Sequence, residues 1–219
     1  MKEKEPDSIE YTMPETLGQS IYNALKKAIL ENKMKAGQKI NEKEIADSFK
    51  VSRTPVREAL VRLEAEGFAK ITSHRDVVVK ECSYEELTDI FQVIGILDGL
   101  AATLVIDKID SKEFIKIEKM MAKLEHYYNH EDIEKYIDMK CEIHNRIWDH
   151  LENKYLQKTL KNCLTHIRRC YYTLNSVVYK KEIIDISMKA HKDILEALKK
   201  KDKKKLKFLI QNQWNPPLM

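Results

Sequence analysis

The chain has 219 residues, a formal net charge of +4, 43% hydrophobic residues and 34% charged residues. This mixture is typical of a soluble protein with a hydrophobic core, and the length allows one large domain or two smaller ones. Only five residues are glycine, and the phosphate-loop patterns GxGxxG and GxxxxGK followed by Ser or Thr do not occur. The sequence therefore argues against a nucleotide-binding fold.

No apolar stretch approaches the ~20 residues that span a bilayer, and the charged start of the chain lacks the apolar core of a signal peptide. We therefore expect a cytoplasmic protein that makes no membrane contact. In that compartment cysteines are expected to be reduced thiols rather than a disulfide framework. The chain has four of them: Cys82, Cys141, Cys163 and Cys170.

The beginning of the chain predicts an arm followed by two helices. Residues 1–14 are polar, and we expect them to form a flexible arm. Apolar residues then recur every three or four positions from Leu17 to Ile29, which predicts the first helix. A second helix is predicted to start after Asn41, because Asn41 and Glu44 form a capping-box pattern.

The segment VSRTPVREALVRLEAEGF, residues 51–68, predicts a third helix. Ser52 is placed to cap it, Pro55 falls in the first turn where a missing N–H costs least, and Gly67 is placed to end it. The β-branched residues on both sides of the polar tip at 73–76 predict a small hairpin. Two short helices joined by a tight turn and followed by a hairpin are typical of a winged helix-turn-helix.

The first turn of the third helix carries side chains that suit DNA. Arg53 and Arg57 can each pair with guanine through two hydrogen bonds, and Thr54 can bind a phosphate or contact a thymine methyl group. The alternative is an exposed charged helix without a partner, but the combination of cap, proline, arginines and hairpin favours DNA. The predicted DNA-binding set is Lys43, Ser52, Arg53, Thr54, Pro55, Arg57 and, at the wing tip, His74 and Arg75.

The remainder of the chain predicts only helices, and the domain boundary is expected near Cys82. We expect a DNA-binding domain at 15–81 and an all-helical effector-binding and dimerisation domain at 82–215. The predicted fold class is mostly α, a winged helix-turn-helix with a small β-hairpin followed by a helical bundle. The candidate helices of the bundle are 84–107, 111–129, 131–151, 154–176, 181–200 and 202–214.

Residues 38–71, above all VSRTPVREAL at 51–60 and LEAEG at 63–67, resemble the signature of the GntR family of bacterial repressors. The helical part resembles the FadR-like branch of that family, whose sensing domain is a bundle of six or seven helices. The resemblance implies a homodimer that binds a DNA operator and responds to a small-molecule effector. It also implies DNA contacts from Lys43, Arg53, Thr54 and Arg57, although the wing tip lacks the glycine that is usual in the family.

Many FadR-like sensing domains hold a divalent metal with an Asp-x3-His pair and two later histidines. The matching positions here are Lys140, His144, His191 and Gln213, so only two of the four ligands remain. A protonated lysine is a poor ligand that opposes a nearby cation, and we therefore expect a broken metal site in which Lys140 attracts an effector carboxylate. Ile94 stands where the family often has an arginine, so we expect an effector that is less acidic than is usual in the family, or one that is held by Arg168 or Arg169 instead.

Other interpretations stay open on the sequence alone. Cys141-x2-His144 and Cys163-x2-His166-x3-Cys170 have spacings that also suit zinc, although cysteines on helices are more often core residues. One alternative function is a metal-dependent, enzyme-like helical domain fused to a DNA-binding head, but the chain has no HExxH and no catalytic triad signature. Another is an architectural DNA binder without an effector. We expect a regulator, acting as a repressor, rather than an enzyme.

Overall fold

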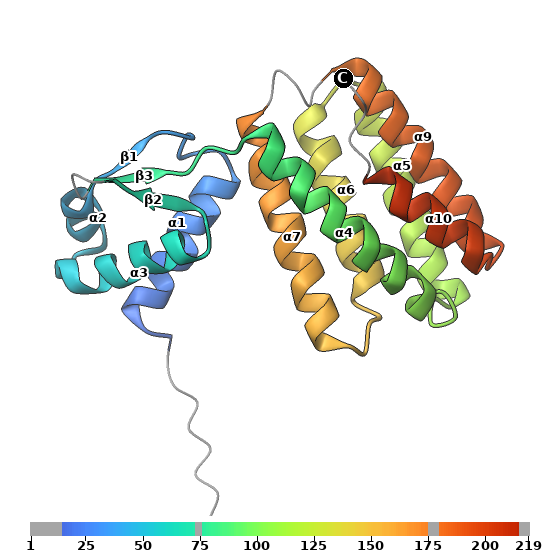
Figure 1. Ribbon diagram of the computed structural model, residues 1–219, viewed down its shortest axis with the longest axis horizontal. Helices are drawn as coiled ribbons and strands as arrows, with labels where there is room; N and C mark the ends of the chain where they lie inside the picture. Colours follow the sequence, from blue (N-terminus) through green and yellow to red (C-terminus); the bar gives the residue numbers. More distant parts are fainter. Residues whose placement is uncertain (1–14, 73–75, 175–179, 215–219) are drawn as a thin grey trace, which may run out of the picture. The chain divides into compact units, whose positions relative to one another are not determined.

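The computed structural model describes residues 15–72, 76–174 and 180–214 (Figure 1). The chain divides into two compact units, residues 1–80 and 81–219, and each is described by itself. The expected fold class is confirmed, because a winged helix-turn-helix with a small antiparallel sheet precedes an all-helical unit. The predicted arm at 1–14 and the wing-tip residues His74 and Arg75 lie outside the described residues.

Within residues 15–72 and 76–80, the N-terminal unit contains three helices and three strands. They are α1 (Leu17–Leu30), β1 (Lys39–Ile40), α2 (Glu42–Phe49), α3 (Arg53–Ala65), β2 (Ala69–Ile71) and β3 (Val77–Val79). The strands form an antiparallel sheet in the order β1-β3-β2. The predicted hairpin is therefore β2 with β3, and the sequence analysis missed the two-residue strand β1, which pairs with β3.

Local signals explain where these helices begin and end. The Asn41 side chain accepts hydrogen bonds from the backbone N–H groups of Lys43 and Glu44, as the capping-box pattern predicts. Ser52 occupies the N-cap of α3 but makes no side-chain cap hydrogen bond, so that part of the prediction is wrong. Gly67 follows α3 with φ of 75°, a left-handed conformation that favours glycine.

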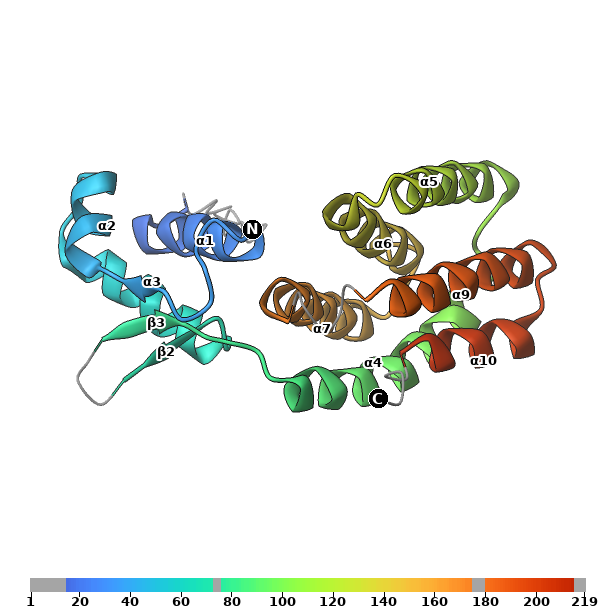
Figure 2. The ribbon, with the colours of Figure 1, turned by 90° about the horizontal axis from the view of Figure 1, so that it is seen from above.

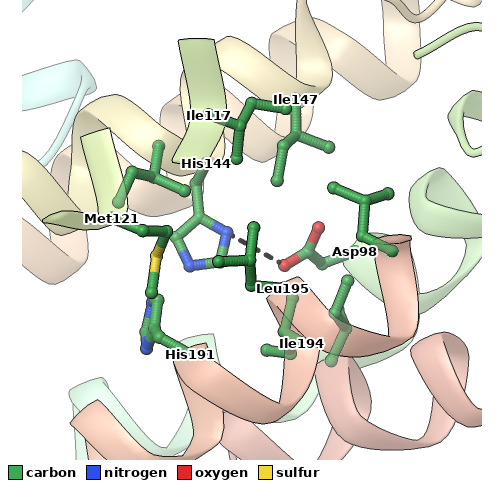
Figure 3. Close-up of a pocket in the computed structure, with 11 residues that line it drawn as sticks. Asp98, Ile117, Met121, His144, Ile147, His191, Ile194 and Leu195 are labelled. Carbon is green, nitrogen blue, oxygen red and sulfur yellow. Dashed lines mark ion pairs between the residues drawn. The ribbon is translucent and has the colours of Figure 1, made fainter. Parts of the chain in front are cut away.

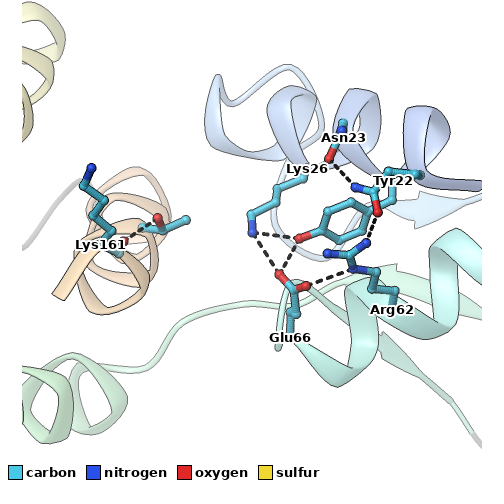
Figure 4. Close-up of polar contacts among 8 residues, drawn as sticks. Tyr22, Asn23, Lys26, Arg62, Glu66 and Lys161 are labelled. Atoms are coloured by element: carbon cyan, nitrogen blue, oxygen red, sulfur yellow. Dashed lines mark hydrogen bonds and ion pairs between the residues drawn. The ribbon is translucent and has the colours of Figure 1, made fainter. Parts of the chain in front are cut away.

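The core of the N-terminal unit lies between α1, α3 and the sheet. Ion pairs and hydrogen bonds reinforce it where Glu66, at the end of α3, faces α1 (Figure 4). Lys26 lies 2.9 Å and Arg62 3.1 Å from the Glu66 carboxylate, and the Tyr22 hydroxyl also donates to it. Burial alone would raise the pKa of Glu66, but these hydrogen bonds outweigh burial and lower the pKa to about 2. The group thus fixes α3 against α1.

The C-terminal unit is a bundle of helices (Figure 2). α4 lies against α7 and α10, whereas α5 lies against α6 and α9. Each element lies within a few residues of a predicted range, because capping residues such as Ser83 and Asp110 mark where helices begin. The described helices are α4 (Tyr84–Val105), α5 (Ser111–Asn129), α6 (Ile133–Trp148), α7 (Lys154–Thr173), α9 (Lys181–Lys199) and α10 (Lys203–Gln213).

α4 corrects one expectation, because it is long and apolar enough to cross a membrane by length and composition alone. Of its most apolar window, 44% is buried inside the unit. Asp98 lies in this helix with only 1% of its surface exposed, held by hydrogen bonds from two tryptophans. α4 is therefore apolar because it packs in the core of the bundle, which also buries the Asp98 carboxylate.

The structure also corrects the expectation that all four cysteines are reduced thiols. A disulfide joins Cys82, just before α4, to Cys170 in the last turn of α7, with a Cα–Cα distance of 5.1 Å. The two residues are 88 positions apart in sequence, and the packing of α4 on α7 brings them together. Cys141 and Cys163 are free.

Candidate functional site

The DNA-facing candidates lie on α2 and on the first turn of α3. The side chains of Lys43, Ser52, Arg53, Thr54 and Arg57 are exposed, and Pro55 is half-buried. On the other side of α3, Val56, Ala59, Leu60 and Leu63 are buried in the core. The sequence pattern therefore divides α3 into a packed face and an exposed basic face, as the spacing predicts.

The two arginines of the exposed face differ in how they are held. Arg53 and Arg57 lie four residues apart, so they share one side of the helix. The Arg57 Nε lies 3.0 Å from a carboxylate oxygen of Glu42 on α2, whereas no ion pair of Arg53 is found within residues 15–72 and 76–80. Because the pair between Arg57 and Glu42 is exposed to solvent, we expect it to be weak enough for a phosphate or base to replace Glu42.

A second cluster of polar groups lies inside the helical unit, around Asp98 (Figure 3). One oxygen of Asp98 accepts a hydrogen bond from Trp148 Nε1 at 2.6 Å, and the other accepts from Trp214 Nε1 at 2.9 Å. The Nδ1 of His144 lies 3.3 Å from the second oxygen. Asp98 thus joins α4 to α6 and to the end of α10. Asp98 was not predicted from the sequence, although an aspartate within an apolar helix is a visible signal.

The two histidines of the cluster each bury an Nε2 atom inside the helical unit. His191 Nδ1 lies 2.7 Å from the Ser187 carbonyl oxygen, so Nδ1 carries the proton. Burial, and then the nearby Lys140 and His144, hold the pKa of His191 well below its usual value, so the ring is neutral. His144 likewise turns Nδ1 to Asp98. Neither Nε2 atom has a hydrogen-bond partner among the described residues, although both are buried.

Lys140 and Gln213 complete the set of four positions. Lys140 is 8% exposed, and its Nζ lies 3.4 Å from the Tyr171 hydroxyl and 5.5 Å from the centre of the Trp214 ring. Burial lowers the pKa of Lys140, and no carboxylate lies within ion-pair distance of it in the described part of the unit. Gln213 also buries both polar side-chain atoms without a partner there.

A small cavity opens beside the histidines. Asp98, His144 and His191 line it together with apolar side chains such as Met121 and Ile147 (Figure 3). Its volume is about 20 Å³, which is room for about one water molecule. Lys140 and Gln213 do not line this cavity, although Lys140 is close enough to lower the pKa of His191.

The other candidates for the effector lie elsewhere. Arg168 is about one-third exposed and pairs with Asp138 on α6 at 2.7 Å, outside the cavity lining. Arg169 is buried and pairs with Glu86 near the start of α4. Ile94 lies in the core, one turn before Asp98. Of the predicted effector residues, the structure therefore groups Lys140, His144 and His191, and it places Arg168 apart from them.

The donor set does not fit a divalent metal well. Two imidazole Nε2 atoms are suitable ligands, but the other two positions carry an amine and an amide, and zinc sites usually have three or four Cys, His or carboxylate ligands. Asp98 already accepts hydrogen bonds from two indoles. No group of three metal-ligating side chains occurs within the described ranges. The zinc spacing at Cys163, His166 and Cys170 is also unavailable, because Cys170 is in a disulfide.

The comparisons with known proteins agree with this division of the chain. The family described as "Bacterial regulatory proteins, gntR family" matches residues 17–79, and the FCD domain matches residues 89–212. A basic helix on a winged scaffold, followed along the chain by a helical bundle, defines a DNA-binding transcription regulator of the helix-turn-helix type. The chain belongs to the GntR family, in the FadR-like branch that carries an FCD domain. It is thus a transcription regulator rather than an enzyme.

Several relatives are similar over most of their length. The chain is 29% identical over 210 residues to the uncharacterized HTH-type transcriptional regulator YdhC of Bacillus subtilis, covering 95% of this chain and 92% of that protein. It is 22% identical to the HTH-type transcriptional repressor RspR of Escherichia coli, covering 85% and 80%. Among solved structures, E. coli McbR/YncC has a TM-score of 0.71 at 22% identity, covering 90% and 94%. That likeness supports the fold.

Proposed function

We propose that this regulator is a homodimeric repressor that reads its operator through α3 and responds to a small hydroxycarboxylate bound in the helical unit. The observation that carries the DNA-binding half is the exposed first turn of α3, where Arg53 and Arg57 share one side. The absence of a Ser52 side-chain cap leaves amides at this helix end available for a phosphate. RspR, which is similar to this chain, is a repressor by name, and this supports the same direction of control.

The effector half rests on the buried polar atoms around His144 and His191. A buried polar group without a hydrogen-bond partner costs about 1–3 kcal/mol, and several occur here together. A carboxylate would offset the buried charge of Lys140, while ligand hydroxyl groups would donate to the two Nε2 acceptors. A hydroxycarboxylate supplies both kinds of group, whereas a plain hydrocarbon chain supplies neither.

The size of the cavity supports a coupling between effector and DNA. A cavity of about 20 Å³ cannot accept a carboxylic acid without movement of the surrounding helices. A ligand that binds only a more open arrangement shifts the population toward it. α4 carries Asp98 in the cavity lining and begins four residues after Lys80, the end of the N-terminal unit. We expect this helix to transmit the change.

The dimer is supported by an apolar stripe on the exposed side of α4. Its members recur every three or four residues and are about half exposed, which is unusual for such large side chains in water. A second copy of the chain presents the same stripe, and two α4 helices can therefore cover one another with two-fold symmetry. Two reading heads would then recognise a palindromic site. The stripe consists of Val93 (50% exposed), Ile96 (67%), Leu100 (46%) and Leu104 (45%).

The DNA-binding half is tested with duplexes selected from a random library by the full-length protein. Arg53→Ala and Arg57→Ala are each expected to weaken binding of the selected duplex by roughly 5- to 150-fold, since one bidentate arginine contact contributes about 1–3 kcal/mol. Arg53→Lys keeps the charge but loses the bidentate geometry, so it separates base reading from phosphate contact. Lys189→Ala, an exposed change on α9, serves as the control. Full selectivity in both arginine variants would contradict the proposal.

The effector half is tested by calorimetry and thermal shift with a panel of hydroxycarboxylates, in the presence of a chelator. A true ligand raises the melting temperature and should do so without added metal. Lys140→Met should abolish the shift and leave the fold intact, because an uncompensated buried charge is removed. Lys189→Met is the matched surface control. Binding that requires a metal, or that survives Lys140→Met unchanged, would contradict this half alone.

A further inference from the structure

We propose that Cys82 and Cys170 form a reversible dithiol–disulfide pair whose oxidation strengthens operator binding. Cys82 lies in the short connection between β3 and α4, two residues after the N-terminal unit ends at Lys80. Cys170 lies in the last turn of α7. The bond between them therefore fixes the beginning of the helical unit, where the chain enters from the DNA-binding unit, to α7.

Non-covalent contacts also join α7 to the start of the helical unit, next to the disulfide. Arg169, next to Cys170, donates to the Glu81 carbonyl oxygen at 3.3 Å and pairs with Glu86 in the first turn of α4. These non-covalent contacts join α7 to the connection and to the first turn of α4 beside the disulfide. We expect the covalent bond to restrict residues 81–83 more than these contacts do alone.

The remaining cysteines are poor competitors for this chemistry. Burial raises the pKa of Cys141 to about 11, and burial likewise raises the pKa of Cys163. Because the thiolate is the reactive form, burial lowers the reactivity of both thiols. Both are free cysteines, whereas Cys82 and Cys170 are already paired. Among the described residues, Cys82 and Cys170 are therefore the two cysteines that the fold places together to form a disulfide.

A peroxide is the oxidant we assign to the forward reaction. One thiolate attacks a peroxide oxygen, the O–O bond breaks, and the released hydroxide takes a proton to form water while the cysteine becomes a sulfenic acid. The second thiol attacks that sulfur, the S–S bond forms and a second water leaves. The two thiols lose two electrons, which reduce the peroxide to two waters. A thiol reductant reverses the change by thiol–disulfide exchange.

The setting of the protein favours a reversible pair. A DNA-binding regulator acts where thiol reductants keep most cysteines reduced, and disulfides formed there are usually transient. Oxidation then adds a cross-link only under oxidant exposure. Because an immobilised connection has less conformational freedom to lose when DNA is bound, we expect the oxidised protein to bind its operator more tightly.

The test uses the full-length protein, first reduced with dithiothreitol and then treated in part with hydrogen peroxide. Peptide mapping without reductant should give a cross-linked peptide that contains Cys82 and Cys170. The melting temperature of the helical unit should rise by roughly 10 °C in the oxidised sample, since the closed loop spans 88 residues. Affinity for the selected duplex should rise about tenfold, and a glutathione buffer should reverse all three changes.

Variants keep the proposal falsifiable. Cys82→Ala and Cys170→Ala should each abolish the redox dependence, and Cys82 lies nearer the surface, so it is the safer of the two changes. Cys163→Ala retains the pair and should behave like the wild type. Failure to form the cross-link, resistance of the cross-link to glutathione, or equal or weaker DNA binding in the oxidised protein would each overturn the proposal. None of these outcomes depends on the effector site.

Discussion

The buried carboxylate of Asp98 gives the sharpest prediction about the helical unit. Asp98→Asn changes one oxygen to an NH2 group, so the side chain keeps one acceptor for two indole N–H groups and the imidazole. At least one indole N–H group then faces the new NH2 group in the core, and two donors cannot form a hydrogen bond with each other. A hydrogen bond to a charged group contributes about 1.5–3 kcal/mol, and a buried unsatisfied donor costs about 1–3 kcal/mol. We therefore expect Asp98→Asn to lower the free energy of unfolding by about 2–4 kcal/mol.

The assay is a urea titration followed by tryptophan fluorescence. The chain has only two tryptophans, Trp148 and Trp214, and both donate to Asp98, so the signal reports on this unit alone. Asp193→Asn, an exposed change on α9, provides the control and should not move the midpoint. A midpoint for Asp98→Asn equal to that of the wild type would refute the idea that the carboxylate supports the cluster.

Three further predictions concern the N-terminal unit. Glu66→Gln should cost about 1–2 kcal/mol at neutral pH, a figure reduced for solvent screening because the Glu66 side chain is 34% exposed. The folded-state pKa of Glu66 is lowered from 4.5 to about 2, so its stabilisation is present above 4.5 and the difference should shrink in denaturation curves as the pH falls toward 2. Leu63→Ala should destabilise the N-terminal unit by about 2–5 kcal/mol in urea titrations followed by circular dichroism, which does not depend on the tryptophans, whereas Val61→Ala, 57% exposed, should have little effect. Gly67→Ala should cost about 1–2 kcal/mol because φ is 75°, and an unchanged midpoint would contradict that reasoning.

The sequence predicted those parts of the fold that depend on neighbouring residues. α3 was readable because an N-cap position, Pro55 and Gly67 mark its ends, and the spacing of Val56 and Leu60 marks its buried side. β1 was missed because two residues are too few to show the alternation of apolar and polar residues that marks a strand. Only their pairing with β3 defines them as a strand. Whether the Ser52 side chain makes a cap hydrogen bond depends on the orientation of its hydroxyl group, which the spacing of residues does not determine.

The candidate site was predicted only in part, because its key contacts join distant positions. Lys140, His144 and His191 were identified by their spacing and by the family resemblance. Asp98 was not, since its partners Trp148 and Trp214 come from other helices. The disulfide was missed for the same reason, and because the expected compartment argued against it. The directions of Arg168 and Arg169 depend on how α7 packs on α6 and α4, and that packing joins positions that are distant in sequence.

The length of α4 has a mechanical consequence for everything attached to it. Asp98 lies 14 residues after Tyr84, which is about 21 Å along a helix that rises 1.5 Å per residue. If the helix pivots as a rigid rod about Asp98, a tilt of about 5° displaces its first turn by about 2 Å. That displacement is large enough to break a hydrogen bond. Small changes in the hydrogen bonds from Trp148 and Trp214 to Asp98 therefore become larger displacements at the first turn of α4.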